Sequence, residues 1–422
     1  MRRKTLQAAV VLALSAPAAA FAQLAQFEAV DTLPWPYRGS FPAYPGEQAR
    51  PVEVWGQAGI ARDSNVFRLS ESANVGAITG RAGRGETIMG AAAGIRLEQR
   101  VVGRQRVRLA ARGDLYSFSN HSVMDHFAYR VTPEWLWEFT NDLSGTVGWD
   151  HTKRLVDLAQ LRRPVKDMVT ENHGYVTAAY RLGPTVRLRG GVDGVRAKRN
   201  AADTDTRANA VTGGVDYVTP LGNAVGIEVR RSTGDQPVTT VLGAPPVDNA
   251  FSEREVALVA TWVVTPQIRT NARVGRTDRE HDQFPAIDFS GTTWNFLVDW
   301  TPLNKTGFSA SWYKVPRSVI DINTSFVLTR GFTLGPRWAP TEKLVFSLLF
   351  SRERQQFSDP TNPLLGPFPL DETVRNWRLM AGWEPVRHFE LAAGLERGER
   401  SSNGIQRDYV YNQLMLSGRY RF

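Results

Sequence analysis

From about residue 50 onward the chain alternates apolar and polar positions with a period of two. The segment 293–300 is a clear case, because four large apolar side chains share one of its faces. They are Trp294, Phe296, Val298 and Trp300. The segments 107–115, 186–194, 344–352 and 413–422 repeat the alternation. Such a pattern predicts strands with one apolar and one wet face, and no helical period of comparable length competes with it.

Tight turns recur at intervals of about 40 residues, the length of two strands with their connections. Prolines mark them at positions 184, 220, 266, 302, 340 and 385. An aromatic residue precedes most of these turns: Tyr217, Trp262, Trp300, Trp338 and Trp383. Trp135, Trp137 and Phe139 hold the same place before the turn at Asn141. Aromatic rings at one constant depth are typical of a membrane interface.

The opposite ends of the predicted hairpins are longer and polar, as in 61–85, 231–252, 277–287 and 352–371. Short turns at one rim and long loops at the other predict a transmembrane antiparallel up-and-down β-barrel of about 18 strands (16–18) over residues 51–422. The turns are expected to be periplasmic and the loops extracellular. The alternation is weakest in 142–155 and 323–337. A β-propeller would need four strands per repeat, where we find two long ones.

The first 22 residues predict a cleaved secretory signal peptide. Arg2, Arg3 and Lys4 precede an apolar stretch that ends in the small-x-small triplet Ala20-Phe21-Ala22. Removing this segment lowers the formal charge from +9 to +6, because it carries three basic residues. Residues 23–50 are rich in proline and aromatic residues without a strand period. We expect them to form a periplasmic extension, and a disordered leader is the alternative that stays open.

The last strand ends on Tyr420 and Phe422 at its apolar face, which is expected to act as the C-terminal signal read by the barrel assembly machinery. Further expected partners are outer-membrane lipid and lipopolysaccharide. Nucleic acid is not expected, given the export signal, and the oligomeric state stays open. The absence of cysteine excludes disulfides and thiolate chemistry.

If the apolar face meets lipid, the alternate positions line the lumen. Charged side chains dominate these positions, and carboxylates such as Asp216, Glu228 and Glu396 accompany the arginines. Two interpretations stay open: pairing across the lumen that stiffens the barrel, or contact with a passing solute, for which a net basic lumen would favour anions. The candidates are Arg106, Arg108, Arg112, Asp114, Arg187, Arg189, Asp193, Arg230, Arg269, Arg273 and Arg378.

Catalytic and cofactor sites are not expected. The densest acidic cluster, Asp278 to Asp282, falls in a predicted external loop and is better explained as solvated than as a metal site. Asp150-His151 would need further groups converging at the strand tips to form a hydrolytic site. No cofactor is predicted, and no metal.

A short motif follows the first predicted strand: Asp63-Ser64-Asn65-Val66-Phe67-Arg68. With the proline-rich leader and the all-β remainder, it resembles the porin-like barrels linked to exopolysaccharide gene clusters, and within these the EpsL-type outer-membrane proteins. The resemblance implies a role in the synthesis or export of extracellular polysaccharide, with polysaccharide export components as partners. Asp63 and Asn65 are turn-formers that would cap the loop. Phe67 and Arg68 would pack it inward over the lumen.

Three functions therefore remain in view. The first is a barrel that serves exopolysaccharide export without chemistry of its own. The second is a general diffusion porin for small solutes. The third, an outer-membrane enzyme, has the least support, because no catalytic constellation is readable.

Overall fold

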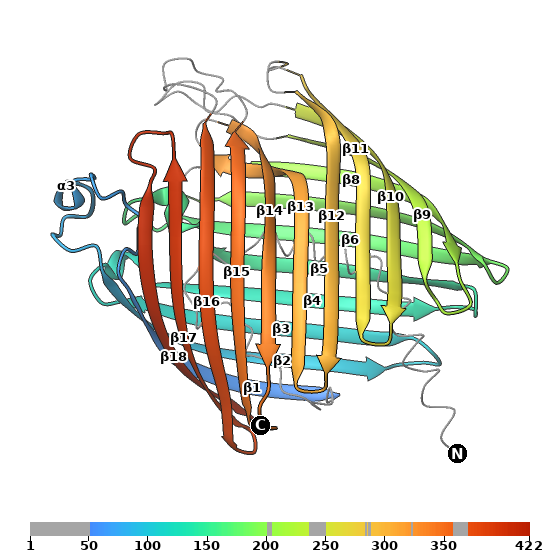
Figure 1. Cartoon of the computed structure of the whole chain (residues 1–422), viewed down its shortest axis with the longest axis horizontal. Coiled ribbons are helices and arrows are strands. Elements are labelled where there is room, and N and C mark those ends of the chain that lie inside the picture. The colour runs from blue at the N-terminus through green and yellow to red at the C-terminus, as the bar shows by residue number, and fades with distance from the viewer. Residues whose placement is uncertain are drawn as a thin grey trace.

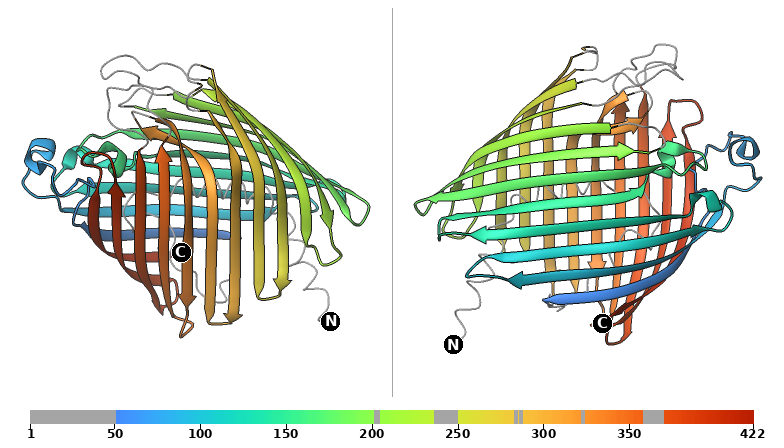
Figure 2. Two further views of the ribbon diagram at one scale, coloured as in Figure 1. Left: turned by 45° about the horizontal axis from the view of Figure 1, so that its top comes forward. Right: turned by 180° about the vertical axis from the view of Figure 1, so that it is seen from behind.

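The computed structural model is a closed ring of 18 antiparallel strands, and it describes residues 51–200, 205–235, 250–282, 285, 288–321, 324–357 and 370–422 (Figures 1 and 2). Consecutive strands pair with one another around the ring. Their bounds are β1 Val52–Asp63, β2 Glu86–Arg100, β3 Arg106–Phe118, β4 His126–Glu138, β5 Leu143–Leu155, β6 Met168–Leu182, β7 Val186–Arg199, β8 Asp205–Val218, β9 Ala224–Asp235, β10 Ala250–Thr265, β11 Ile268–His281, β12 Phe289–Leu303, β13 Thr306–Asp321, β14 Thr324–Trp338, β15 Leu344–Phe357, β16 Asp371–Val386, β17 Phe389–Ser402 and β18 Tyr409–Arg421. The all-β barrel prediction is confirmed, including the two segments with the weakest alternation.

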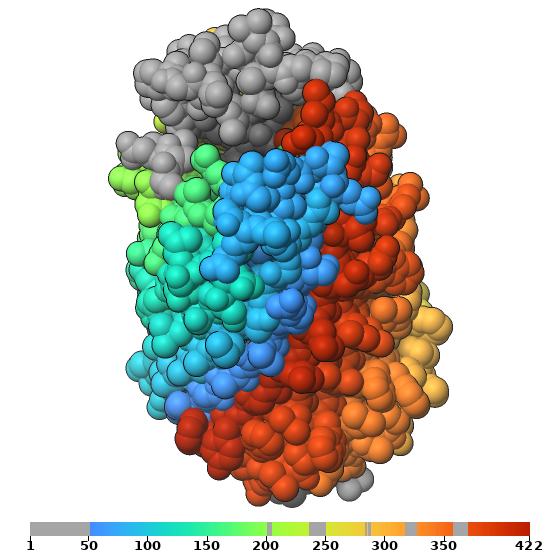
Figure 3. Space-filling view, turned by 90° about the vertical axis from the view of Figure 1, so that its left-hand side faces the viewer, coloured from blue at the N-terminus to red at the C-terminus, as the bar shows by residue number. Residues whose placement is uncertain are grey.

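The ring closes where the first strand meets the last. β1 pairs with β18 from Trp55↔Arg421 to Asp63↔Gln413, and the backbone N–H of Phe422 donates to the carbonyl of Val54 at 2.8 Å. Figure 3 shows the start of the described chain, in blue, beside the last strands, in red, on the surface. Closure matters because it leaves no strand edge with unpaired backbone groups, the condition for crossing lipid.

The outer face carries the large apolar side chains, and the predicted aromatic ring lies on it. Tyr217, Trp262, Trp300, Trp338 and Trp383 are all exposed. Trp135 and Phe139 are exposed as well, whereas Trp137 is buried against Phe139 and over Gly145.

These aromatics keep one depth because the strands are tilted. Trp262 shares a hydrogen-bonded row with Val298, Leu334 and Trp377. On β12, Trp300 lies two residues further along the strand than the residue in the row. The offset is four residues for Trp338 on β14 and six for Trp383 on β16. Relative to the aromatic residues, the row therefore shifts by about one residue per strand, which is the stagger of a tilted barrel.

Several strands continue further toward the long-loop rim than the sequence indicated. β11 runs to His281, so the acidic segment expected in a loop is strand for most of its length. Strand β13 likewise runs to Asp321, which pairs with Thr324 of β14. Alternation does not reveal these ends, because both faces are polar above the apolar band.

The loops at the start of the chain form a small core at this rim. The β1–β2 loop carries helix α3 (Val75–Thr79), the β3–β4 loop a 3-10 helix (Ser122–Met124), and the β5–β6 loop helix α4 (Leu158–Leu161). Buried side chains of these loops pack against lumen-facing residues at the long-loop ends of β2 and β3. The cluster includes Val66, Phe67, Leu69, Ile88, Phe118, Met124 and Leu158. In the part of the chain described, no helix has the length and apolarity to cross a membrane.

Candidate functional site

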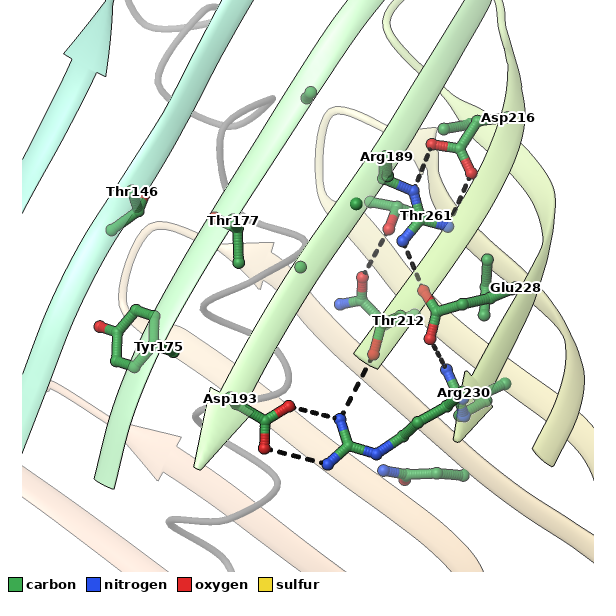
Figure 4. A pocket seen from close by; sticks show the side chains of 18 of the residues that line it. Thr146, Tyr175, Thr177, Arg189, Asp193, Thr212, Asp216, Glu228, Arg230 and Thr261 are labelled. Carbon is green, nitrogen blue, oxygen red and sulfur yellow. Dashed lines mark hydrogen bonds and ion pairs between the residues drawn. The ribbon is translucent and has the colours of Figure 1, made fainter. Parts of the chain in front are cut away.

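A ladder of ion pairs crosses the inner wall from β7 to β11 (Figure 4). Arg189 donates from Nε and Nη2 to the carboxylate of Asp216 at 2.7 and 2.8 Å, and from Nη1 to Glu228 at 2.5 Å. Glu228, fully buried, also accepts from Nη1 of Arg273 at 2.8 Å. Arg273 in turn donates from Nε to Glu255 at 3.0 Å. Glu228 thus lies between two cations, Arg189 of β7 and Arg273 of β11.

Glycines opposite the charged residues make room for the ladder. Gly214 is the cross-strand partner of Arg189 on one side and of Glu228 on the other. A Cβ added there would lie 3.1 Å from the Arg189 guanidinium, which passes over the glycine to reach the next strand. Gly226 plays the same part for Asp216, whose Oδ1 would lie 2.1 Å from an added Cβ.

The other predicted lumen residues also occupy inward positions, and most are paired. Arg269 lies directly across the β11–β12 ladder from Asp299. The remaining partners are Glu98 for Arg106 and Arg108, Asp114 for Arg112, Asp216 for Arg187, Asp193 for Arg230 and Glu396 for Arg378. This pairing neutralises much of the positive charge that the sequence reading assigned to the lumen. Contact of these residues with a solute stays a prediction.

Uncharged polar side chains fill the wall between the ion pairs. They line a cavity of about 480 Å³ together with the ladder, within the usual range for small-molecule sites. Thr212 accepts from Arg230, and Thr261 bonds to Asn271. The hydroxyl and amide residues of this lining include Thr146, Thr177, Thr212, Thr261, Asn271, Thr293, Asn295 and Ser311.

Sequence reasoning missed two parts of this wall. Glu255, which completes the ladder, lies on β10, a strand whose lumen-facing residues were not singled out. Trp55 points inward and lies between two guanidinium groups, Arg419 at 4.6 Å and Arg112 at 5.3 Å from its ring. The alternation along β1 could have identified Trp55 as lumen-facing, because Val54 and Ile60 at the alternate positions are exposed on the outer face.

The loop motif forms a buried network at the long-loop rim. Asp63 accepts from the backbone N–H of Asn65 at 2.8 Å and from the Arg68 guanidinium at 2.8 Å. Arg68, at a positive φ of 53°, also stacks on Tyr411 of β18 at 3.4 Å. Burial disfavours the charged guanidinium, but Asp63 and Tyr411 outweigh it, so the pKa of Arg68 is raised. Phe67 packs edge-on against His121 of the next loop. The motif thus fastens the first loop to the wall.

The candidate catalytic residues do not converge. Asp150 pairs with Arg130, whereas its neighbour His151 bonds to Tyr129 and stacks on the exposed Trp149. Successive strand residues point to opposite faces, so the two side chains diverge. Among the described residues no group of three or more His, Cys, Asp or Glu side chains is arranged to hold a metal ion.

No family model and no curated protein matches the chain. Similar solved structures include proteins of Pseudomonas aeruginosa, at low identity. The outer membrane protein OpdK has 11% identity and a TM-score of 0.47, with 88% of this chain and 99% of that chain covered. OccK3 (OpdO) has 14% and 0.47, covering 88% and 95%. OccK2 (OpdF), solved in complex with glucuronate, has 10% and 0.47, covering 90% and 100%.

These comparisons do not support the resemblance to EpsL-type exopolysaccharide proteins. The location of the protein follows from its fold instead. A closed ring of 18 antiparallel strands with an apolar exterior leaves no open strand edge in lipid, and it is the architecture of bacterial outer-membrane barrels. The protein is a multi-pass β-barrel of the outer membrane.

Proposed function

We propose that the protein is a channel for small hydrophilic solutes across the outer membrane. The observation that carries this proposal is the chemistry of the inner wall, where balanced ion pairs alternate with threonine, serine and asparagine side chains. Such a wall offers hydrogen bonds to a hydrated solute without holding it through an unpaired charge. This is a porin-type function, and it requires no bond-making chemistry from the chain.

Planar bilayers provide the direct test. The full mature chain, inserted from detergent, should produce discrete conductance steps that grow with salt concentration. Liposome swelling with sugars of increasing size would then give the size limit of the pathway. Well-inserted barrels that produce no conductance steps and admit no sugar would contradict the proposal.

A role in exopolysaccharide export remains the second candidate, and only the Asp63–Arg68 motif favours it. The two functions separate in a deletion strain. Slower uptake of small solutes with unchanged secreted polymer would support the channel alone. Loss of secreted polymer that is restored by the wild-type chain would favour export.

A further inference from the structure

A belt of basic side chains surrounds more than half of the barrel's outer face near the long-loop rim. On β10, β14 and β16 the outward residue eight positions before the aromatic ring is arginine: Arg254 before Trp262, Arg330 before Trp338, and Arg375 before Trp383. The outward positions between them are apolar throughout, for example Val256 and Leu258 on β10. The outer belt comprises Arg62, Arg231, Arg254, Arg276, Lys314, Arg330, Arg352, Arg375 and Arg397.

The belt lies at the second membrane interface. Eight residues extend roughly 26 Å along a strand, and a tilt of about 40° reduces this to about 20 Å of depth. That distance is close to the roughly 25 Å apolar band of an outer-membrane barrel. The aromatic ring lies on the side of the tight turns and both described chain ends, so the belt lies on the side of the long loops, where the extracellular leaflet meets water.

The belt places like charges directly opposite one another. The register pairs Arg231 with Arg254, Lys314 with Arg330, and Arg352 with Arg375. Arg330 is also paired on its other side with Arg354. Like charges at directly opposed positions destabilise a sheet. Four such pairs on one face therefore favour nearby negative charge that compensates them.

The chain supplies only part of that charge. Asp278 pairs with Arg276 and lies directly across the β10–β11 ladder from Arg254. Glu399 pairs with Arg375 and Asp371 with Arg354. At the level of the belt itself, the other outward residues described on β9 to β18 and β1 are Thr292 and Asn412, and neither is acidic. The side chains of Arg231, Arg254 and Arg352 have no ion pair or hydrogen bond with another described residue.

We propose that the outer belt binds the phosphate groups of lipopolysaccharide in the outer leaflet. Guanidinium groups present fixed forks of donors that match phosphate oxygens. Phosphates between two opposed arginines would turn their repulsion into attraction. The inference rests on the membrane position of the barrel and not on its channel function.

The test uses the full mature chain in a zwitterionic detergent, with purified lipopolysaccharide as the probe. One variant replaces four belt residues by glutamine (Arg254→Gln, Arg330→Gln, Arg352→Gln, Arg375→Gln). A matched control makes the same charge change at four exposed positions on the tight-turn rim (Arg104→Gln, Lys305→Gln, Lys343→Gln, Arg387→Gln). Each basic residue near an anionic surface contributes about fivefold in affinity, so the belt variant should bind about a hundredfold or more weakly. The control should bind like wild type.

Stability gives a second readout that a misfolded variant cannot imitate. Without lipopolysaccharide the belt variant should melt at the same or a higher temperature than wild type, because the opposed charges are gone. With lipopolysaccharide the wild type should melt at a higher temperature than the belt variant. Phosphatase-treated lipopolysaccharide should remove the difference. Three results would each overturn the proposal. They are an unchanged affinity of the belt variant for lipopolysaccharide, an equal loss of affinity in the control variant, and binding of phosphatidylglycerol by the wild type as tightly as lipopolysaccharide.

Discussion

At the scale of single residues, the inner wall depends on a few positions where charge and space are matched. Arg189 bonds to two carboxylates at once, and its guanidinium passes close over Gly214 to reach β9. A carboxylate of this ladder that loses its arginine keeps a negative charge facing the pathway. Substitutions here should therefore change which ions pass, and not only how stable the wall is.

Arg189→Ala should make the proposed channel more cation-selective. The loss leaves Asp216 and Glu228 with one cation fewer, and one uncompensated charge about 4 Å from a passing ion contributes about 1 kcal/mol in water, or up to roughly fivefold in local ion concentration. Reversal potentials under a salt gradient measure the shift. Arg397→Ala, on the outer face, removes the same charge and should leave the potential unchanged. An unaltered potential in the Arg189 variant would show that the ladder does not face the ion path.

Gly226→Ala should destabilise the barrel by about 1–3 kcal/mol, the usual cost of overpacking. The added Cβ would lie 2.3 Å from the carbonyl of Val215, which is backbone and cannot turn aside. Gly213→Ala is the matched control, because nothing lies within 4 Å of its added Cβ. That change should be neutral or stabilise by up to about 1 kcal/mol, since alanine loses less entropy in a strand. Urea unfolding in lipid vesicles compares them, and equal effects would count against the close packing at Gly226.

At the scale of elements, the sequence predicted the strand ends more closely at the tight-turn rim than at the long-loop rim. Aromatic residues and prolines mark where strands end near the turns, as at Trp300 and Pro302. Near the loops both faces are wet, so the alternation fades before β11 or β13 actually ends. The ladder partner Glu255 and the outer belt depend on register between strands, which no single strand's pattern contains.

The first loop is the element whose attachment can be tested directly. Asp63→Ala would leave the buried Arg68 guanidinium without its carboxylate, and breaking a buried ion pair costs about 3–5 kcal/mol. The expected result is cleavage within residues 64–85 under limited proteolysis that spares the wild type. Glu71→Ala removes an exposed carboxylate from the same loop and should not increase cleavage. Resistance of the Asp63 variant would mean that the hydrophobic contacts of Phe67 hold the loop alone.

At the scale of the whole molecule, the last residue joins the two ends of the ring. Phe422 donates its backbone N–H to Val54, while its ring is 72% exposed and meets Tyr420 edge-on. The side chain thus contributes little burial, and its recognition during assembly stays a prediction. The sequence placed both aromatics on the apolar face, and the structure agrees.

Deletion of Phe422 should reduce the amount of folded barrel in the outer membrane by several-fold, whereas Phe422→Tyr should retain it. The change in gel mobility between unheated and heated samples measures the folded fraction in membrane preparations. Refolding of both variants into detergent separates assembly from stability, because a purely recognitional role leaves refolding intact. Normal membrane levels of the deleted form would contradict the role of Phe422 in assembly.

The one-residue climb per strand has a mechanical consequence. The hydrogen-bonded row that begins at Trp262 in the aromatic ring ends at Arg397 in the outer belt. Hydrogen bonds are the stiff links between strands, so each row acts as a diagonal brace from one leaflet to the other. A force that lipids of the outer leaflet exert on the barrel is therefore transmitted around its circumference to the opposite rim. The wall resists twisting as well as stretching.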